Sequence, residues 1–101
     1  MAAVVDIGTL IVSSPELRGG RPRVAGTGLT VMRLAGWSKL GCTPEDIVRK
    51  TGLSLAQVHA ALAYYHANRE AIDADLEAEA ELYDQLAAAQ RSQQQQEREQ
   101  P

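Results

Sequence analysis

The sequence predicts a mainly helical protein, in which a short N-terminal β-ribbon precedes a three-helix helix-turn-helix domain and a long C-terminal helix. Three observations predict this order of elements. Four glycines and a proline fall within residues 19–28. Helix-capping residues then recur at Thr30, Thr43 and Ser54. Finally, residues 67–90 contain neither glycine nor proline, so nothing in them ends a helix.

The first thirty residues favour short extended segments. Leu10-Ile11-Val12 is a strand-like run, and Arg21-Pro22-Arg23-Val24 lies between two pairs of glycines. The glycine and proline content excludes a helix interior and suits two short strands joined by tight turns. Because a two-stranded ribbon is marginal in water, we expect it to pack on the helices or to pair with a second copy. We predict a homodimer that forms through these strands.

Each helix of the predicted domain has a clear beginning and end. A residue with a capping hydroxyl precedes each of the three helices, and a glycine follows each of the first two. The third helix opens with a capping box and has one apolar face. The first helix is expected between Thr30 and Gly41, and the second between Thr43-Pro44 and Gly52. The third starts at Ser54, whose partner in the capping box is Gln57.

The segment from Pro44 to about Tyr64 predicts the helix-turn-helix, and the helix before it makes the arrangement homeodomain-like. Gly52 lies where the chain must reverse between the two helices. Many three-helix domains use the same turn without touching nucleic acid, so the pattern indicates a fold more strongly than it indicates DNA binding. The positions expected to pack the two helices together are Ile47, Leu53, Val58 and Ala61.

The net charge of −3 conceals two parts of opposite sign. Residues 1–52 carry seven Lys/Arg and four Asp/Glu, a sum of +3, whereas residues 53–101 carry three and nine, a sum of −6. The basic residues could contact phosphates, and a few polar residues of the third helix could reach base edges. A solvated basic surface explains the same residues without DNA. The candidate DNA-binding residues are Arg21, Arg23, Arg49, Lys50, Ser54, Gln57 and His59.

The 101 residues suffice for one small domain and an appendage. Only five of the larger apolar residues follow position 66, so we expect the core to lie in the first two-thirds of the chain. The predicted organisation is a β-ribbon plus helix-turn-helix domain at 1–66, an acidic helical arm at 67–90 and a disordered tail at 91–101, which has no apolar residue.

The arm predicts a binding element for a basic, partly apolar partner. Residues 70–84 hold seven acids and no base, and a narrow apolar stripe continues through them. Like charges at helical spacing destabilise an isolated helix, so such a segment gains most by docking. A solvated spacer or a self-associating coil is the alternative. The candidate partner-binding residues are Ile72, Asp73, Leu76, Glu77, Glu79, Ala80, Tyr83 and Asp84.

Several classes of function are disfavoured. The glycines of 19–28 lack the strand-to-helix setting and the lysine of a phosphate-binding loop. His59 and His66 are seven residues apart and lack a third metal ligand. Cys42 is the single cysteine, which suggests a reducing, cytoplasmic location. No apolar run approaches the roughly 20 residues of a membrane helix. We find no nucleophile with a base and predict a non-enzyme without cofactor or membrane partner.

Two motifs resemble the bacterial domain-of-unknown-function family 433. They are Leu10–Thr27, with the distinctive Gly-Gly-Arg-Pro and Gly-Thr elements, and Gly41–Tyr65. The similarity covers about residues 7–68, so it leaves the arm out. Members of the family look like VapB-type antitoxins, encoded beside PIN-like ribonuclease toxins. They usually have an arginine after the Gly-Thr pair, where this chain has Gly28.

The resemblance implies a helix-turn-helix dimer that binds its toxin and its own operator. We therefore expect an antitoxin of a type II toxin-antitoxin system, which neutralises a PIN-like ribonuclease by direct binding and regulates its operon through DNA. The alternative is a stand-alone helix-turn-helix transcriptional regulator without a toxin partner. A pure interaction adaptor is a third possibility. A small ribonuclease-like gene beside this one would favour the antitoxin.

Overall fold

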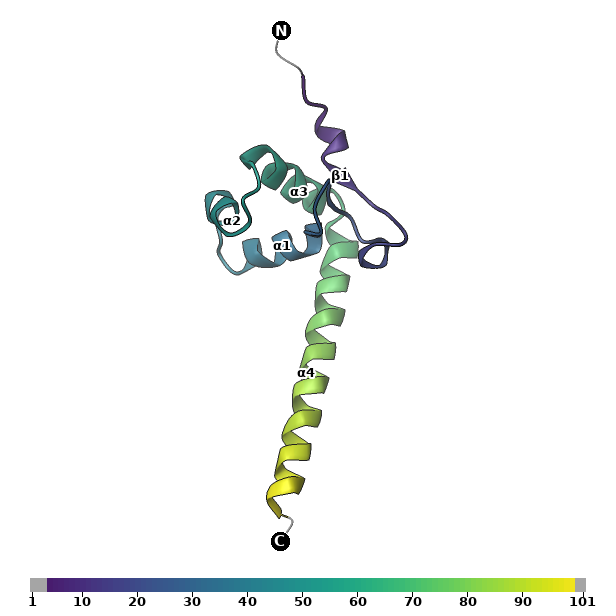
Figure 1. Ribbon diagram of the computed structural model, residues 1–101, viewed down its shortest axis with the longest axis vertical. Helices are drawn as coiled ribbons and strands as arrows, with labels where there is room; N and C mark the ends of the chain where they lie inside the picture. The colour runs from purple at the N-terminus through teal and green to yellow at the C-terminus, as the bar shows by residue number, and fades with distance from the viewer. Residues whose placement is uncertain (1–3, 100–101) are drawn as a thin grey trace.

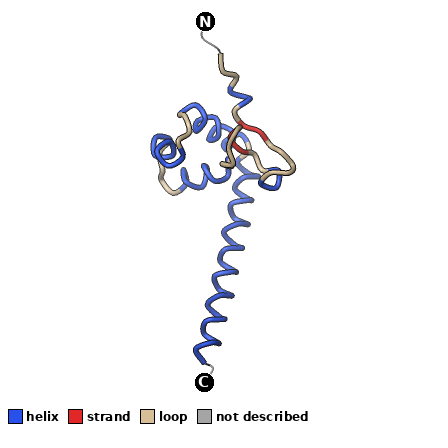
Figure 2. The backbone as a smooth tube through the Cα atoms, in the orientation of Figure 1, coloured by secondary structure: helices blue, strands red, loops and turns tan. Residues whose placement is uncertain are grey.

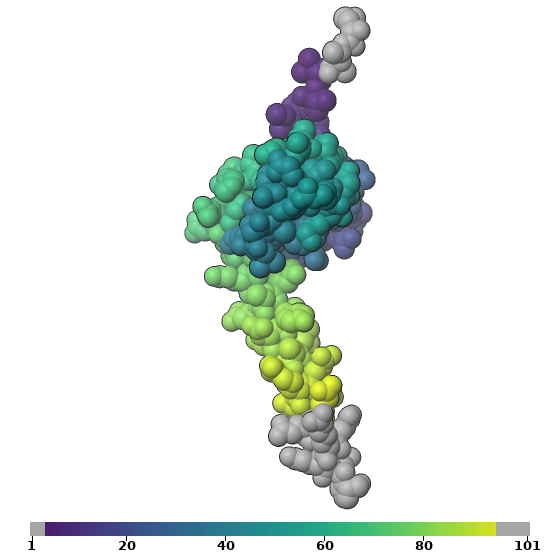
Figure 3. Space-filling model, turned by 90° about the vertical axis from the view of Figure 1, so that its left-hand side faces the viewer, coloured from purple at the N-terminus to yellow at the C-terminus, as the bar shows by residue number. Residues whose placement is uncertain are grey.

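The computed structural model describes residues 4–99 and consists of a small head, residues 7–67, from which one long helix projects (Figure 1). The molecule measures 75 × 28 × 23 Å, and the space-filling view shows the narrow helix leaving the compact head (Figure 3). The elements in chain order are η1 (Ile7–Thr9), β1 (Ile11–Val12), η2 (Arg18–Gly20), β2 (Arg23–Val24), α1 (Val31–Lys39), α2 (Pro44–Thr51), α3 (Leu55–Ala67) and α4 (Arg69–Glu99).

The two strands form the predicted ribbon. They pair antiparallel, with Ile11 opposite Val24 and Val12 opposite Arg23 (Figure 2). The ribbon lies against α3, and the side chain of Val24 is fully buried. The loop after β2 folds back, because the backbone N–H of Val31 donates to the carbonyl of Pro22 at 2.9 Å. The helices of the same chain thus support the ribbon.

The helices of the head begin at the residues that the sequence predicts. The hydroxyl of Thr30 accepts a hydrogen bond from the backbone N–H of Arg33 at 3.2 Å. Thr43 and Ser54 each take part in a complete capping box, which satisfies backbone donors at the starts of α2 and α3. Gly52 ends α2 in the left-handed conformation, at φ 75°, which a side chain would disfavour.

A single core joins the three helices of the head. All four positions expected to pack α2 on α3 are buried, as predicted. The single apolar face predicted for α3 is corrected in part, because Leu55 is 45% exposed whereas Ala60 is buried. α1, α2 and the ribbon all contact α3, so its buried surface is not a single stripe. The buried core residues are Val24, Val31, Met32, Leu34, Ala35, Ile47, Leu53, Val58, Ala61, Tyr65 and Ile72.

The core extends into the predicted arm, which corrects the expectation of a core within residues 1–66. Ile72 of α4 is only 5% exposed and belongs to the core. The chain reaches it through a helix break at Asn68, where φ is −127° and ψ is 34°. The sequence predicted no break here, since no glycine or proline is present. The amide of Asn68 donates to the carbonyl of Tyr64 at 3.0 Å, a local bond that competes with continued helix.

The C-terminal helix is longer than predicted. It runs to Glu99, whereas the sequence predicted disorder from Arg91 onward. Glutamine, glutamate and arginine are good helix formers, and neither glycine nor proline interrupts them before Pro101. Residues 100–101, the end of the predicted tail, lie outside the described part of the chain. Within residues 4–99, no helix combines the length and apolar character that crossing a membrane requires.

Candidate functional site

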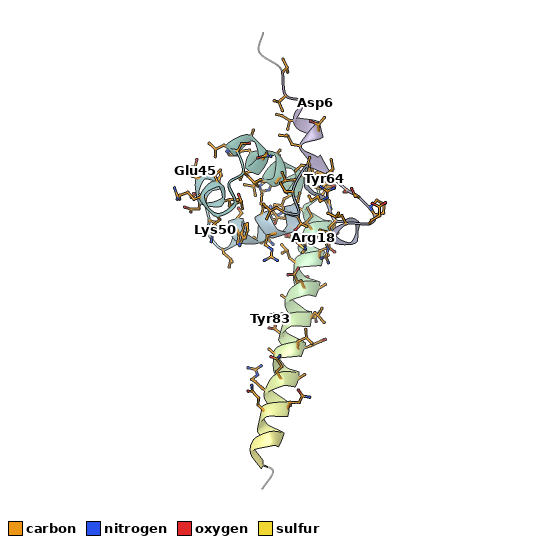
Figure 4. The ribbon with its side chains drawn as sticks, viewed as in Figure 1. Asp6, Arg18, Glu45, Lys50, Tyr64 and Tyr83 are labelled. Atoms are coloured by element: carbon orange, nitrogen blue, oxygen red, sulfur yellow. The ribbon has the colours of Figure 1, made fainter. Side chains whose placement is uncertain are left out.

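The distal part of α4 exposes large apolar side chains, which the described part of the chain leaves more than half uncovered. Leu82, Tyr83 and Leu86 are 56%, 72% and 58% exposed. At 3.6 residues per turn, these three positions lie within about 100° of the helix circumference and form one stripe. Figure 4 shows Tyr83 on α4 well away from the head. We call these three residues the apolar stripe of α4.

Acidic residues surround the apolar stripe. The exposed acids on the same turns are Glu77, Glu79, Glu81 and Asp84. Among the residues whose side chains are described, none of these four acids forms an ion pair. The resulting surface is apolar along one side and strongly negative around it. Its chemistry suits a groove that is apolar at its base and basic at its rims.

The structure divides the eight predicted partner-binding residues into two sets. Glu77, Glu79, Ala80, Tyr83 and Asp84 are exposed, as a binding surface requires. The other three face the head, and for them the prediction is corrected. Leu82 and Leu86 were not predicted, although they are among the few large apolar residues in the second half of the chain. The inward-facing residues are Ile72, which is buried, Leu76, which packs on the core, and Asp73, which is bound by neighbouring side chains.

Asp73 holds α4 to the head. Its Oδ1 lies 2.5 Å from Nζ of Lys39 on α1 and accepts a hydrogen bond from the hydroxyl of Tyr65 on α3 at 2.8 Å. Nε of Arg69 lies 3.8 Å from Oδ2. The bonds from Lys39 and Tyr65 hold the pKa of Asp73 below its ordinary value, and the bond to Asp73 raises the pKa of Lys39. Asp73 therefore links α4 to the head through its bonds with side chains of α1 and α3.

We expect the Asp73→Asn substitution to weaken the dependence of the free energy of unfolding on pH in the acidic range. Because the pKa of Asp73 is lower in the folded state than in the unfolded state, its charge stabilises the fold above about pH 4, and this contribution is lost as pH falls through the lowered pKa. The measurement is the free energy of unfolding in urea at a series of pH values. Its dependence on pH should be weaker in the variant.

The exposed acid Glu77, on the same helix, provides the control for this experiment. Glu77→Gln removes an equal charge but breaks no ion pair between described residues, so it should change the pH dependence of stability less than Asp73→Asn does. A residual slope is expected in every variant, because the backbone N–H of Thr43 lowers the pKa of Asp46. Identical slopes in Asp73→Asn and the unsubstituted protein would contradict the role assigned to Asp73.

The predicted DNA-binding residues do not form one surface. Arg23 is half-buried, and its guanidinium donates to the carbonyl of Thr27 at 3.2 Å and to the hydroxyl of Ser14 at 3.0 Å. Arg23 therefore braces the ribbon, and its prediction as a phosphate contact is corrected. Arg21 is exposed and lines a pocket beside α1, together with Arg18 and Arg33, which also belong to the basic residues that could contact phosphates.

The other five predicted residues lie around the turn from α2 to α3. Arg49 is 72% exposed at its side chain and pairs with Asp46. Nζ of Lys50 lies 5.8 Å from the centroid of the Trp37 ring. His59 is exposed. Ser54 and Gln57 satisfy each other's backbone N–H groups at 3.1 and 2.8 Å, so their side-chain oxygens serve the start of α3.

The fold and its exposed elements define a class: a small helical domain with an N-terminal two-stranded ribbon and a projecting C-terminal helix. Residues 11–65 match the sequence profile described as "Protein of unknown function (DUF433)". Because the match spans more than half of the chain, the protein belongs to the DUF433 family, and the resemblance seen in the two motifs is confirmed.

A solved structure shows the same fold. The chain is similar to a DUF433 member protein from Anabaena variabilis, with a TM-score of 0.64 and 27% sequence identity. The similarity covers 68% of this chain and 69% of that chain. None of the curated proteins matches this chain. The comparisons therefore establish the family and the fold.

Proposed function

We propose that this protein is a cytoplasmic antitoxin of a type II toxin-antitoxin system, which neutralises a PIN-like ribonuclease by direct binding through α4. The observation that carries the proposal is the uncovered apolar stripe, Leu82, Tyr83 and Leu86, within an acidic helix that stands away from the head. The resemblance of the family motifs to VapB-type antitoxins supports the same assignment.

The physical argument starts from the cost of an isolated helix. Helices gain most of their stability in proteins by packing an apolar face, and among the described residues the distal part of α4 projects beyond the other elements (Figure 1). The acids around the stripe add like-charge repulsion, which a partner with basic groups would relieve. A basic, partly apolar groove is therefore the surface that α4 fits best.

A ribonuclease has such a groove where it binds the phosphates of RNA. An acidic helix in that groove would occupy the positions of the phosphates and block access of substrate. Attraction between the acidic helix and a basic toxin would also raise the association rate by about 10- to 1,000-fold at low salt. Speed matters for an antitoxin, since a free toxin acts on RNA as soon as it is released.

The proposal requires a small ribonuclease-like reading frame beside this gene, and the test uses the protein that it encodes. We expect that protein to cleave RNA, and an equimolar amount of the full chain to suppress the cleavage and to co-migrate with the toxin in size-exclusion chromatography. An active neighbouring ribonuclease that shows no inhibition and no complex would overturn the proposal.

We also propose that a dimer of the chain binds operator DNA through α2 and α3. Two observations favour this second role. Arg49 and Lys50 at the end of α2 and His59 on α3 are exposed near the turn at Gly52. In addition, β2 is the one strand that pairs with β1 in the described part of the chain, so the other edge of β1 could pair with a second copy, and exposed apolar residues precede it. These residues are Val4, Val5 and Ile7.

The double variant Arg49→Ala and Lys50→Ala removes both cations of α2 and is expected to weaken operator binding. It should also reduce the slope of log affinity against log salt concentration by about 2, because the variant neutralises two phosphates fewer. Gel shifts with the promoter DNA of the gene at several salt concentrations measure both quantities, and sedimentation equilibrium measures the dimer. Arg69→Ala, which removes an exposed cation on α4, is the control. Equal affinity and slope in all three proteins would reject the DNA-binding role.

A further inference from the structure

The corner between the head and α4 holds an open pocket with a volume of about 680 Å³. Its walls come from η2, the loop before α1, α1 itself and α4 (Figure 4, near Arg18). Pockets of about 300–1,000 Å³ are typical of sites for small molecules. The size alone thus permits a ligand, and the side chains in the walls indicate its chemistry.

Three arginines line the pocket, against one glutamate. Arg18 belongs to η2, Arg21 directly follows η2, and Arg33 belongs to α1. The glutamate is Glu79 of α4. Within the described part of the chain, none of the three guanidinium groups forms an ion pair. Three unpaired guanidinium groups in one pocket attract an anion, and their planar forks match the oxygens of phosphate or carboxylate.

The backbone is shaped to bring Arg18 into this group. Arg18 is the one residue other than glycine with positive φ in the described chain, at 53°. Its guanidinium lies directly over Gly28: a Cβ placed on Gly28 would be 3.0 Å from Nη2 of Arg18. A side chain at position 28 would therefore displace the arginine. Unfavourable backbone conformations of this kind concentrate at binding sites, where they position a functional group.

Apart from Thr30, the side chains in the remaining walls are apolar. Leu29, Met32 and Trp37 line the head side, and Leu82 lines the side of α4. An inorganic ion would leave these side chains without a contact, whereas the body of an organic ligand would cover them. The projecting α4 thus forms one wall of the pocket, and the head forms the others.

We propose that this pocket binds a small organic anion, with its phosphate or carboxylate group on Arg18, Arg21 and Arg33 and its apolar or aromatic body against Trp37 and Leu82. The ligand would contact both the head and α4. The pocket shares Leu82 and Glu79 with the surface proposed to bind a toxin, but ligand binding requires no partner protein and can be measured on the chain alone.

Phenyl phosphate is the probe that tests the proposal. Trp37 is the single tryptophan of the chain and lines the pocket, so its fluorescence reports an occupant directly. Titration calorimetry on the full chain should show one site, with an affinity at least about tenfold higher for phenyl phosphate than for inorganic phosphate or phenol, since each of those fills only half of the site. Benzoate distinguishes a carboxylate ligand from a phosphate ligand.

Substitutions at exposed arginines supply matched variants. Arg33→Gln and Arg18→Gln should each lower the affinity for phenyl phosphate at least about fivefold, a loss expected when a charged hydrogen bond is removed. Arg49→Gln removes an equal charge from α2, outside the pocket, and should change nothing. Circular dichroism confirms that each variant is folded.

Three outcomes would overturn the proposal. The first is no saturable binding of any of the four compounds to the folded protein. The second is an equal loss of affinity in Arg49→Gln and Arg33→Gln, which would indicate general surface attraction. The third is a single-stranded oligonucleotide that binds more tightly than phenyl phosphate and loses affinity in Arg33→Gln, which would assign the pocket to nucleic acid. All of these experiments use the chain without a toxin. A negative result would therefore reject the ligand site and leave the antitoxin proposal unaffected.

Discussion

Replacing Ile72 by alanine should destabilise the whole head, although this residue belongs to the projecting helix. Its side chain is 5% exposed and is part of the same core as Leu34, Ile47 and Val58. Truncating a buried isoleucine to alanine costs about 2–5 kcal/mol, which is a large fraction of the 5–15 kcal/mol that stabilises a typical domain. Urea unfolding followed by circular dichroism measures the loss.

Leu86→Ala is the matched control for this experiment. It shortens an aliphatic side chain on the same helix, at a position 58% exposed, and should change the free energy of unfolding by less than about 0.5 kcal/mol. If Ile72→Ala unfolded at the same urea concentration as the unsubstituted protein, the docking of α4 on the head would be disproved.

The position of Ile72 determines how the chain can be divided in experiments. A deletion that starts at residue 67 removes Ile72 from the core and Asp73 from its bonds to Lys39 and Tyr65. Such a fragment would lose partner binding through unfolding alone. Loss of function in it would therefore say nothing about the exposed part of α4, and substitutions in the full chain are the proper test.

The starts of the helices could be predicted because capping is local chemistry. Thr30, Thr43 and Ser54 each act on a backbone N–H group three residues ahead, so a short window of sequence contains both partners. Gly52 is predictable for the same reason, since the left-handed residue that ends α2 is the glycine itself. The two-stranded ribbon was likewise marked by its glycines.

The break at Asn68 could not be predicted in this way. Asparagine is tolerated within helices, and the residues on both sides favour helix. What distinguishes this position is the gain from burying Ile72 and bonding Asp73, and both depend on residues of α1 and α3 that are distant in sequence. Tertiary packing therefore decided where α3 ends and α4 begins.

The candidate sites also combine features that the sequence predicts with features that depend on tertiary packing. The exposure of the acids of α4 is predictable from composition, because a long charged helix has few places to bury them. By contrast, sequence does not reveal which arginines turn inward. Arg23 bonds within the ribbon, while Arg18 and Arg33 meet in the pocket only because η2 folds beside α1. The sequence signal for the pocket is weak: an unusual Gly28, which leaves room for the Arg18 guanidinium.

The apolar stripe of α4 should dominate binding to the toxin. We expect the triple variant Leu82→Ser, Tyr83→Ser and Leu86→Ser to bind the neighbouring ribonuclease at least about 100-fold more weakly, since the loss of one buried anchor in an interface commonly costs about 2 kcal/mol or more. The head should stay folded, because all three side chains are more than half exposed and none belongs to the core.

The control for this variant lies on the other side of the same helix. Gln85→Ser with Ala88→Ser changes two exposed positions away from the stripe, introduces the same residue type and should leave affinity within about twofold. Calorimetry with the purified ribonuclease gives both affinities, and inhibition of RNA cleavage should follow them. If the triple variant still inhibited the ribonuclease with unchanged affinity, the helix would not be the inhibitory element. Inhibition would then have to come from the head, and the ribbon edge at β1 and the α2–α3 pair would be the next surfaces to substitute.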